Sequence, residues 1–390
     1  MSTSMIDVAV VGTGIPGLTA ALGFAQQGFR VALIGPRPVP HRPTPAAPFD
    51  ARIYAVAPAS IALFEQIGIW GSVDQQRVCA VERMRVFGDD GHELAFDAYG
   101  ATVERLATIV EEAELLRVLD AACGFQPAVK RIASAFVSIR NETDAINVDL
   151  EDGSSVAARL LVGADGSNSS VRAAAGINAS IKSYQQTAVV GNFASQRPHL
   201  NTAWQWFSSE GVVALLPLPG NHVSLVWSAP VAVARELMEL APADFAARVT
   251  QRCGAALGEL TSIGAPHTFP LRRIAVTRLV AARLALIGDA AHVVHPLAGQ
   301  GLNLGLQDVA LLLRVVGARE SFRAPGDAVL LRRYERGRAE AIALMRFTTD
   351  SLAQLFALDD PLARRLRNVG LATVNRLSPL KNALIRRALG

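Results

Sequence analysis

The feature that most constrains the fold is the stretch of residues 283–305, where a short apolar run leads into Gly-Asp and then into a glycine-punctuated turn. The run at residues 284–287 predicts a strand buried on both faces. Gly288 and Asp289 follow at its carboxyl end, which is where open α/β sheets bind ligands. The turn then predicts a helix N-terminus whose backbone N–H groups can approach an anionic or dipolar group. Its candidate binding residues are Pro296, Gly299, Gln300, Gly301, Leu302 and Asn303.

A strand, a tight turn and a helix are also predicted at the amino terminus. Residues 6–11 form an apolar run, and further apolar residues then recur at helical spacing until Gly28. Between the two, Gly12, Gly14 and Gly17 have the spacing of a dinucleotide-binding turn. In such a turn the first glycine makes the bend, the second lets the backbone meet a pyrophosphate, and the third allows close packing of the helix on the strand.

A third apolar run, residues 160–163, leads into Asp165 and Gly166. Because strands of an open α/β sheet bind ligands at their carboxyl ends, we expect all three motifs to converge on one site. Acidic side chains there can accept hydrogen bonds from sugar hydroxyls, while backbone amides at helix N-termini favour negative charge. Together these groups point to a flavin nucleotide.

One position departs from the usual dinucleotide pattern. Gly35 stands where such folds commonly place an acidic residue on a ribose hydroxyl, so the ribose must be held by backbone, water or another side chain. The nearby Arg37 can signal a 2′-phosphate and hence NADP. The Gly288-Asp289 element and the turn that follows it favour FAD instead.

With these motifs the chain resembles the FAD-dependent aromatic monooxygenases of the p-hydroxybenzoate hydroxylase fold, and among them the ubiquinone-biosynthesis hydroxylases. The most specific segment is HPLAGQGLNLGLQD at residues 295–308. The similarity extends over nearly the whole chain, through residues 50–52, 63–70, 165–172, 184–190, 211–217 and 224–227 and the basic region after Tyr334.

The resemblance implies an FAD-dependent monooxygenase that hydroxylates the aromatic ring of a polyprenylated phenol or benzoquinol in ubiquinone biosynthesis, through a flavin hydroperoxide. It implies NAD(P)H or another reductant as electron donor and dioxygen as co-substrate. It also places Arg52 where the family contacts the flavin, the alternative being an ion pair with Asp50 or a neighbour. Catalytic residues are not assigned. Two other functions remain open: a soluble hydroxylase of a small phenol, and a non-catalytic flavin-fold subunit of a lipid-biosynthesis complex.

The expected fold class is α/β, with a discontinuous Rossmann-like FAD-binding domain, an antiparallel-sheet substrate domain and C-terminal helices. The substrate domain is expected at residues 76–100 and 179–269, where short β-like runs alternate with turn residues. Residues 346–390 are expected to form a basic helical segment. The FAD-binding domain is expected to combine residues 1–75, 101–178 and 270–345.

The composition, 51% hydrophobic and 18% charged, is that of a folded protein. The three cysteines are isolated, which disfavours disulfides and zinc sites and favours a reducing, cytoplasmic setting. His292 and His295 lack a third metal ligand at suitable spacing, so we expect no metal site and a structural or flavin-proximal role.

Neither a signal peptide nor a membrane-spanning run is evident. Three tryptophans either line an apolar pocket or pack in a core, namely Trp204, Trp206 and Trp227.

Basic charge is concentrated at the carboxyl terminus. Residues 361–390 carry seven Lys or Arg and no acidic residue, in a chain whose formal net charge is +4. Leucine and valine interleave these positions, as in segments that bind an anionic membrane surface or an acidic partner. We therefore expect peripheral contact with the inner face of a membrane or an acidic partner. The family resemblance adds a lipophilic aromatic substrate and ubiquinone-biosynthesis subunits as possible partners. The alternative is a helical cap with a solvated basic face. Nucleic-acid binding is disfavoured because no recognition motif accompanies the charge.

Overall fold

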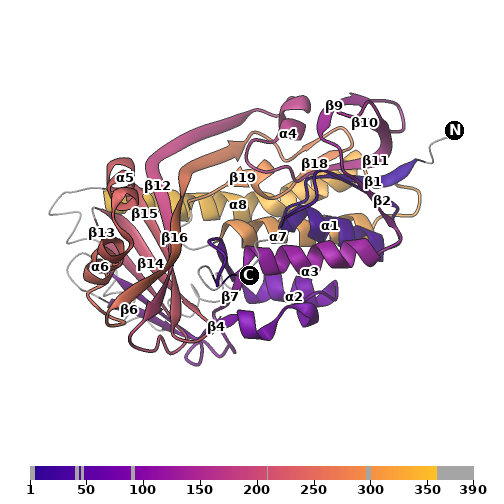
Figure 1. Ribbon diagram of the computed structural model, residues 1–390. Coiled ribbons are helices and arrows are strands. Elements are labelled where there is room, and N and C mark those ends of the chain that lie inside the picture. Colours follow the sequence, from indigo (N-terminus) through magenta and orange to yellow (C-terminus); the bar gives the residue numbers. More distant parts are fainter. Residues whose placement is uncertain are drawn as a thin grey trace.

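The protein has two main β-rich regions joined by helices (Figure 1). The computed structural model describes residues 5–39, 44, 48–88, 93–208, 210–295 and 300–357, with side chains to 348 and at 351 in the last range. A largely parallel sheet lies at the right of the view and a mostly antiparallel sheet, also of eight strands, at the left. The predicted α/β class is confirmed.

The first sheet has a parallel centre. Its strand order is β17-β18-β11-β1-β2-β8, and all of these neighbours pair in parallel except β17 with β18. Strands β9 and β10 extend β11 as an antiparallel flap. The bounds are β1 Ile6–Val11, β2 Val31–Ile34, β8 Val129–Ile132, β9 Phe136–Asn141, β10 Ile146–Leu150, β11 Ser155–Gly163, β17 Val280–Ala281 and β18 Leu284–Leu286.

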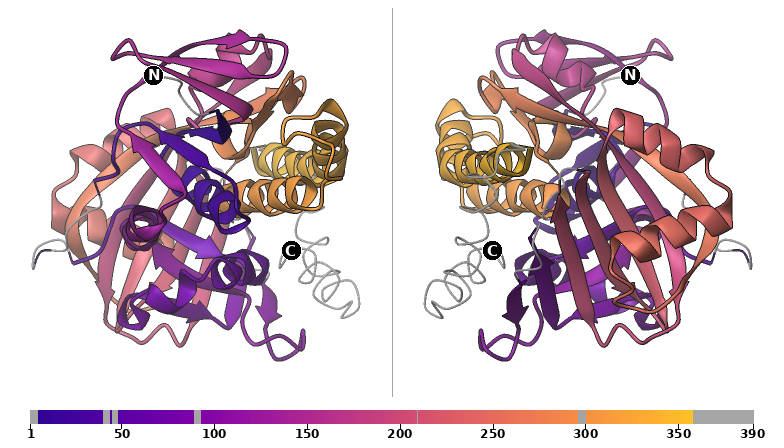
Figure 2. Two further views of the ribbon diagram at one scale, coloured as in Figure 1. Left: turned by 90° about the vertical axis from the view of Figure 1, so that its right-hand side faces the viewer. Right: turned by 90° about the vertical axis from the view of Figure 1, so that its left-hand side faces the viewer.

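The second sheet has the order β19-β16-β12-β15-β14-β13-β5-β6, antiparallel throughout except for the pair β13 and β5. Helices α5 Val231–Glu239 and α6 Pro242–Arg252 lie across one of its faces (Figure 2, right). The strand bounds are β5 Arg83–Phe87, β6 Glu93–Asp97, β12 Ala179–Ser195, β13 Thr202–Ser208, β14 Gly211–Leu218, β15 His222–Pro230, β16 Leu260–Val276 and β19 His292–Val293.

A small antiparallel sheet lies between the two larger ones and contacts β14 of the second. It has the order β3-β7-β4, with bounds Ile53–Val56, Ala107–Glu111 and Cys79–Val81. The long helix α8, Ala328–Ala357, contacts strands of both larger sheets and so ties them together. The other helices are α1 Ile15–Gln26, α2 Pro58–Gln66, α3 Glu112–Phe125, α4 Ser170–Ala174 and α7 Gly301–Gly317, with short 3-10 turns at Trp70–Ser72, Gln75–Arg77 and Gly288–Ala290.

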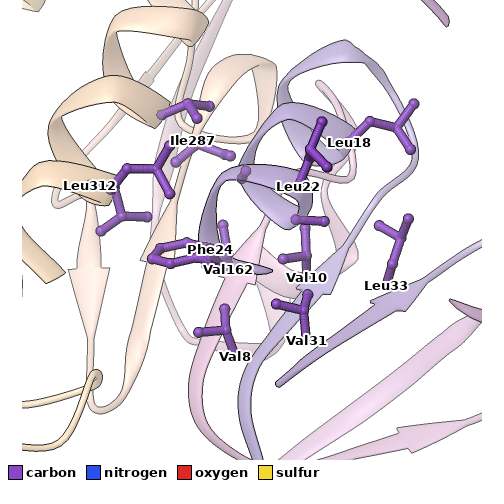
Figure 3. Packing of buried hydrophobic residues seen from close by; sticks show 14 of the residues in the cluster. Val8, Val10, Leu18, Leu22, Phe24, Val31, Leu33, Val162, Ile287 and Leu312 are labelled. Carbon is purple, nitrogen blue, oxygen red and sulfur yellow. The ribbon is translucent and has the colours of Figure 1, made fainter. Parts of the chain in front are cut away.

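The main core forms where α1 and α7 pack beside the parallel strands (Figure 3). Every residue of β2 is buried, as expected for a parallel strand covered on both faces. In α1, Leu18, Leu22 and Phe24 are buried against this sheet, and Leu312 of α7 joins them. This core fixes the strand ends that carry the candidate site.

The observed strands cross some of the domain boundaries expected from the sequence. Strand β16 continues past residue 270 to Val276 and pairs with β12 along its length. Strand β4, within the expected substrate segment, pairs with β7 in the small sheet. Helix α8 runs through residue 346 without a break, and residues 358–390 lie outside the described part of the chain. The division into domains itself stays a prediction.

Candidate cofactor site

The three strand-terminal motifs meet at one edge of the parallel sheet. Val11 of β1 pairs with Gly163 of β11, and Gly163 pairs with Leu286 of β18. The strands are parallel, so the residues that follow them emerge side by side. A hydrogen bond from Ala164 N to Val11 O, at 2.8 Å, holds the first two ends together. The convergence predicted from the sequence is therefore confirmed.

Two of the three amino-terminal glycines are required by the packing of the protein itself. Gly12 has φ +118°, and a Cβ there would lie 2.2 Å from the carbonyl oxygen of Ala164. A Cβ on Gly17 would lie 2.1 Å from the carbonyl oxygen of Gly12. These positions therefore close the turn and hold α1 against β1, as their spacing predicts.

Gly14 differs, because a Cβ there would meet nothing within 4 Å. It is the N-cap of α1 and has no side chain with which to cap the helix. Unsatisfied N–H groups and the helix dipole make such an end attractive to an anion. The open space in front of Gly14 thus fits the pyrophosphate of a dinucleotide.

A second helix N-terminus lies beside the first. Gly288 has φ +58°, and its Cβ would lie 3.3 Å from Pro16 at the start of α1. Gly305, in the second turn of α7, packs so closely on Gly288 that a Cβ would be 3.0 Å from its Cα. At Gly301, which begins α7, a Cβ would meet nothing within 4 Å. The two helix starts therefore lie close together, each leaves space for a ligand at its first glycine, and both favour negative charge.

Asp289 lies beside these helix ends, and the space into which its exposed side chain points is called the hollow below. Its side chain is exposed, yet the protein around it is dense enough to raise the pKa of its carboxyl by desolvation. His292, Arg52 and Arg272 oppose that rise, and Glu112 adds to it. A carboxylate that solvent reaches but protein surrounds can accept hydrogen bonds from ligand hydroxyls, as an FAD ribose or ribityl chain would require.

Arg52 lies close enough to Asp289 to oppose the rise in the pKa of its carboxyl, and it is held by an ion pair. Its Nη1 is 3.4 Å from Glu112 Oε1, and the Tyr54 hydroxyl donates to the same oxygen at 2.9 Å. The Arg52 guanidinium carbon lies 4.7 Å from the centre of the Phe269 ring. Burial is the main cause that raises the pKa of the Tyr54 hydroxyl, and the negative charge of Glu112 is the second. This phenol therefore stays protonated and remains a donor at neutral pH. The alternative of an ion pair with a neighbour is thus observed, with Glu112 as the partner.

Asp165 uses both carboxylate oxygens within the protein. One accepts from the Ser169 hydroxyl and the other from Val171 N, at 3.0 Å, so the side chain stabilises the start of α4. Gly166 follows in the left-handed region with φ +80°. The nearby loop is tied to the second sheet by Arg272, which donates to Ser167 Oγ at 2.6 Å. A cofactor contact of Asp165 and Gly166 stays a prediction.

Asn303 is buried, and its amide joins α7 to the segment around β3. Its Oδ1 accepts from Ala57 N and from the Ser60 hydroxyl, each at 2.9 Å, while its Nδ2 donates to Ala55 O at 2.8 Å. Any cofactor contact here must therefore come from the main chain. Gln300 is the N-cap of α7, Leu302 packs on the main core, and Pro296 and Gly299 lie outside the described residues.

Beneath the site, a buried carboxylate that we did not predict from the sequence holds the Gly288 loop. Asp308 of α7 accepts from Gly288 N at 2.9 Å and pairs with His292 at 2.7 Å. Its other oxygen accepts a hydrogen bond from Arg338 Nε of α8, at 2.6 Å. Tyr334 of α8 adds a hydrogen bond to Leu286 O, at 2.8 Å. The apolar face of α7 was readable, but nothing in the sequence marked this aspartate as buried.

The remaining candidates are placed by packing. His295 Nε2 lies 2.8 Å from Gln186 Oε1, and its ring meets Tyr184 edge-on, so it links the site to β12. Among the described residues, no group of His, Cys, Asp or Glu could hold a metal ion. Trp204 and Trp227 pack in the core under α5 and α6, and Trp206 stacks on Phe87 at 5.5 Å.

Comparison with known proteins identifies the family. The FAD binding domain family model matches residues 5–348. The chain belongs to this FAD-binding family. It is 36% identical over 389 residues to the ubiquinone hydroxylase UbiL of Rhodospirillum rubrum, covering 98% of this chain and 89% of that protein. It is 33% identical to the 3-demethoxyubiquinol 3-hydroxylase of Escherichia coli, covering all of both chains.

Solved structures agree with the family assignment. The fold is similar to that of PqsL of Pseudomonas aeruginosa, a probable FAD-dependent monooxygenase, with a TM-score of 0.79 and 25% identity. The match covers 95% of this chain and 100% of PqsL. The resemblance to FAD-dependent aromatic monooxygenases expected from the motifs is therefore confirmed, and FAD is the cofactor that the open site fits.

Proposed function

We propose that this protein hydroxylates the aromatic ring of a polyprenylated phenol or benzoquinol in ubiquinone biosynthesis. The family and the relatives make the chain an FAD-dependent monooxygenase. The observation that carries the proposal is that two helix N-termini and Asp289 lie close together, and that a Cβ at Gly14 or at Gly301 would meet no atom within 4 Å. The substrate class is supported by what the relatives are named for.

The residues of this chain bind and orient the cofactor. The starts of α1 and α7 face the anionic groups, and Asp289 accepts from hydroxyls. Arg52, held by Glu112, supplies a fixed positive charge beside the hollow. When bound, FAD provides the redox chemistry by which dioxygen becomes able to hydroxylate an electron-rich ring. Asp308 and Arg338 hold the Gly288 loop from below, so that the site is formed before the cofactor binds.

The remaining reactants are part of the proposal. NAD(P)H or another reductant supplies two electrons, and dioxygen supplies the inserted oxygen atom, the other atom leaving as water. The substrate side must exclude water so that the activated oxygen atom is transferred to the ring and is not lost as hydrogen peroxide. The antiparallel sheet, with its apolar face toward β3 and β7, is suited to that role.

The proposal is tested by quinone analysis of a strain in which the gene is deleted. Loss of ubiquinone with accumulation of a prenylated intermediate lacking one ring hydroxyl is expected, and the wild-type gene should restore ubiquinone. The Gly14→Val gene is the matched control and should not restore it. A normal quinone profile, with rapid oxidation of NADPH by the purified protein and simple phenols, would favour the small-phenol hydroxylase. A purified protein without bound FAD would favour the non-catalytic subunit.

The carboxyl-terminal segment is proposed to bring the enzyme to its lipophilic substrate, either at an anionic membrane surface on the inner face of the membrane or through acidic subunits of a biosynthetic complex. Residues 361–390 lie outside the described part of the chain. None of the described helices is long and apolar enough to cross a bilayer. Each Lys or Arg near an anionic bilayer contributes about 1 kcal/mol, so a few such residues give reversible attachment.

Vesicle sedimentation tests this attachment. Replacing Arg364, Arg365, Arg386 and Arg387 by Gln should reduce binding to anionic vesicles, while bound FAD and its absorbance spectrum remain unchanged. The matched control also removes four positive charges, by Gln at the exposed residues Arg83, Lys130, Lys182 and Arg235, and should bind as the wild type does. Raised salt should weaken wild-type binding, because charges are screened over about 8 Å at physiological ionic strength. Equal binding by all three proteins would contradict the attachment.

A further inference from the structure

The second sheet has one sealed face and one face that solvent reaches. On the sealed face, Leu215, Leu225 and Trp227 are fully buried under α5 and α6. On the opposite face of the same central strands, Leu216 and Val226 remain only partly buried. Strands β14 and β15 each have a neighbouring strand on both sides. Solvent must therefore reach these two residues through the face of the sheet and not from its edge. An apolar space therefore lies over this face.

Strand β3 borders that space. Its residues Ile53 and Ala55 are partly buried and pack in one cluster with Leu216. Arg52, which lies at the cofactor hollow, immediately precedes Ile53. The apolar space is thus adjacent to the candidate cofactor site and lies between the sheet and the segment that carries Arg52.

Two polar side chains stand on this otherwise apolar face. Asn192 of β12 pairs in register with Ser224 of β15, and Ser224 pairs with Leu216 of β14, so the three side chains share one face. Asn192 is 6% exposed and Ser224 only 1% exposed. Within the described part of the chain, neither Asn192 Oδ1 nor Ser224 Oγ has a hydrogen-bond partner.

The orientation of the Asn192 amide is fixed by its other end. Its Nδ2 donates to the main-chain oxygen of Asp50 at 3.0 Å, so the nitrogen must face that carbonyl and the oxygen is left as an acceptor. The Ser224 hydroxyl can both donate and accept. Side by side on neighbouring strands, the two groups offer one acceptor and one donor without bonding to each other.

Buried polar groups without a partner are uncommon and destabilise the fold, so two as cross-strand neighbours require an explanation. We propose that Asn192 and Ser224 bind the ring oxygen of the aromatic substrate, and this inference rests on the proposed function. A ring hydroxyl donates to Asn192 Oδ1 and accepts from the Ser224 hydroxyl. Directly opposite side chains in a sheet are about 5 Å apart at Cβ, so one oxygen atom can bond to both of them. Because both polar atoms are buried, neighbouring side chains must shift to admit the ring.

The pair also defines the kind of substrate. Both side chains are uncharged, so they match a neutral phenol or quinol oxygen, whereas a carboxylate would need a cationic partner in a buried place. The neighbours Leu216 and Val226 match the apolar ring and the prenyl chain. The two residues position the ring, and they select a phenol over a benzoate.

Ser224→Ala tests the pair, because it removes one hydroxyl and leaves the apolar wall intact. The probes are 2-geranylphenol and geranylbenzene, which differ by the ring hydroxyl, titrated into FAD-loaded protein while the flavin absorbance is recorded. The wild type should bind the phenol about tenfold more tightly, the value of one good hydrogen bond. Ser224→Ala should lose most of that preference. Its thermal unfolding temperature should not fall, because the hydroxyl has no partner to lose.

The matched control is Trp204→Phe, which removes a buried indole N–H that also lacks a partner among the described residues but lies on the sealed face. This variant should keep the wild-type preference for the phenol. Equal preference in wild type and Ser224→Ala would overturn the inference, as would a wild type that binds both probes equally. The proposed function is tested separately by the quinone profile. If the wild-type gene restores ubiquinone in the deletion strain but either of these two binding results is obtained, the role of Asn192 and Ser224 is refuted and the proposed function is not.

Discussion

The two large sheets build their binding surfaces in different ways. The parallel sheet places its candidate groups at the ends of β1, β11 and β18, and these groups are backbone N–H groups and consecutive residues of the chain. The antiparallel sheet places its candidate groups on a face, one residue from each of several strands. A site at strand ends needs special residues next to one another, and so it can be recognised in the sequence. A site on a sheet face is formed by every second residue of several strands. These residues are far apart in the chain, so they form no recognisable sequence motif.

The parallel sheet also separates glycines that serve the fold from glycines that leave room for a ligand. Gly17 and Gly14 lie in one turn and belong to one motif. A side chain at Gly17 would collide with backbone, whereas a side chain at Gly14 would enter open space. Substitutions at the two positions should therefore fail in different ways, and they provide the first test of the comparison.

The largest effect is expected for Gly17→Val. The added Cβ would lie 2.1 Å from the Gly12 carbonyl oxygen, and backbone cannot move aside without separating α1 from β1. We expect a loss of about 3 kcal/mol or more in the free energy of unfolding, or no folded protein. Urea unfolding followed by circular dichroism measures this. Wild-type stability in Gly17→Val would show that the helix and strand do not pack as closely as described.

Gly14→Val should instead fold normally and lose FAD. Its Cβ would meet no protein atom within 4 Å, and its side chain would occupy the space before the α1 N-terminus. We expect FAD affinity to fall roughly ten- to hundredfold, with unfolding within about 1 kcal/mol of wild type. Fluorescence titration of the FAD-free protein gives the affinity. A yellow, fully loaded Gly14→Val protein would place the pyrophosphate elsewhere.

Asp289→Ala tests the carboxylate at the strand end of β18. Removing a charged acceptor of ligand hydroxyls should cost about 1.5 to 3 kcal/mol of FAD binding, or one to two decades in affinity. Asp244→Ala, which removes an exposed carboxylate on α6, is the control and should bind FAD as the wild type does. Should Asp289→Ala retain wild-type affinity, the hollow beside Arg52 is not where the cofactor's hydroxyls lie.

The smallest effect is expected for Tyr334→Phe. The Tyr334 hydroxyl donates to Leu286 O from a fully buried position, so its removal leaves a buried carbonyl with one partner fewer. A loss of about 1 kcal/mol in the free energy of unfolding should follow. FAD affinity should stay within about twofold, because the tyrosine supports the strand and not the ligand. A larger loss of FAD than of stability would mean that α8 shapes the cofactor site directly.

The sequence by itself determined the parallel sheet and the edge at which its three candidate motifs meet. Gly12, Gly17 and Gly288 are dictated by positive φ or by contact with backbone, and those local demands restrict the choice of residue. Alternation of apolar runs with turn residues indicated the antiparallel sheet, though not where its strands end. Strand β16 passed the expected boundary because its pairing with β12 continues to Val276, a long-range interaction that no local pattern encodes.

Only the tertiary structure decided which polar groups meet. Asp308 pairs with Arg338 across two helices, and Asn192 lies beside Ser224 because of the register of β12 against β15. The pairing of β12 with its other neighbour shifts register just before Asn192, so counting along the strand would not fix the facing of every residue. Polar side chains far apart in the chain carry no mark of their partners. Their burial and pairing follow from packing, which depends on the whole fold.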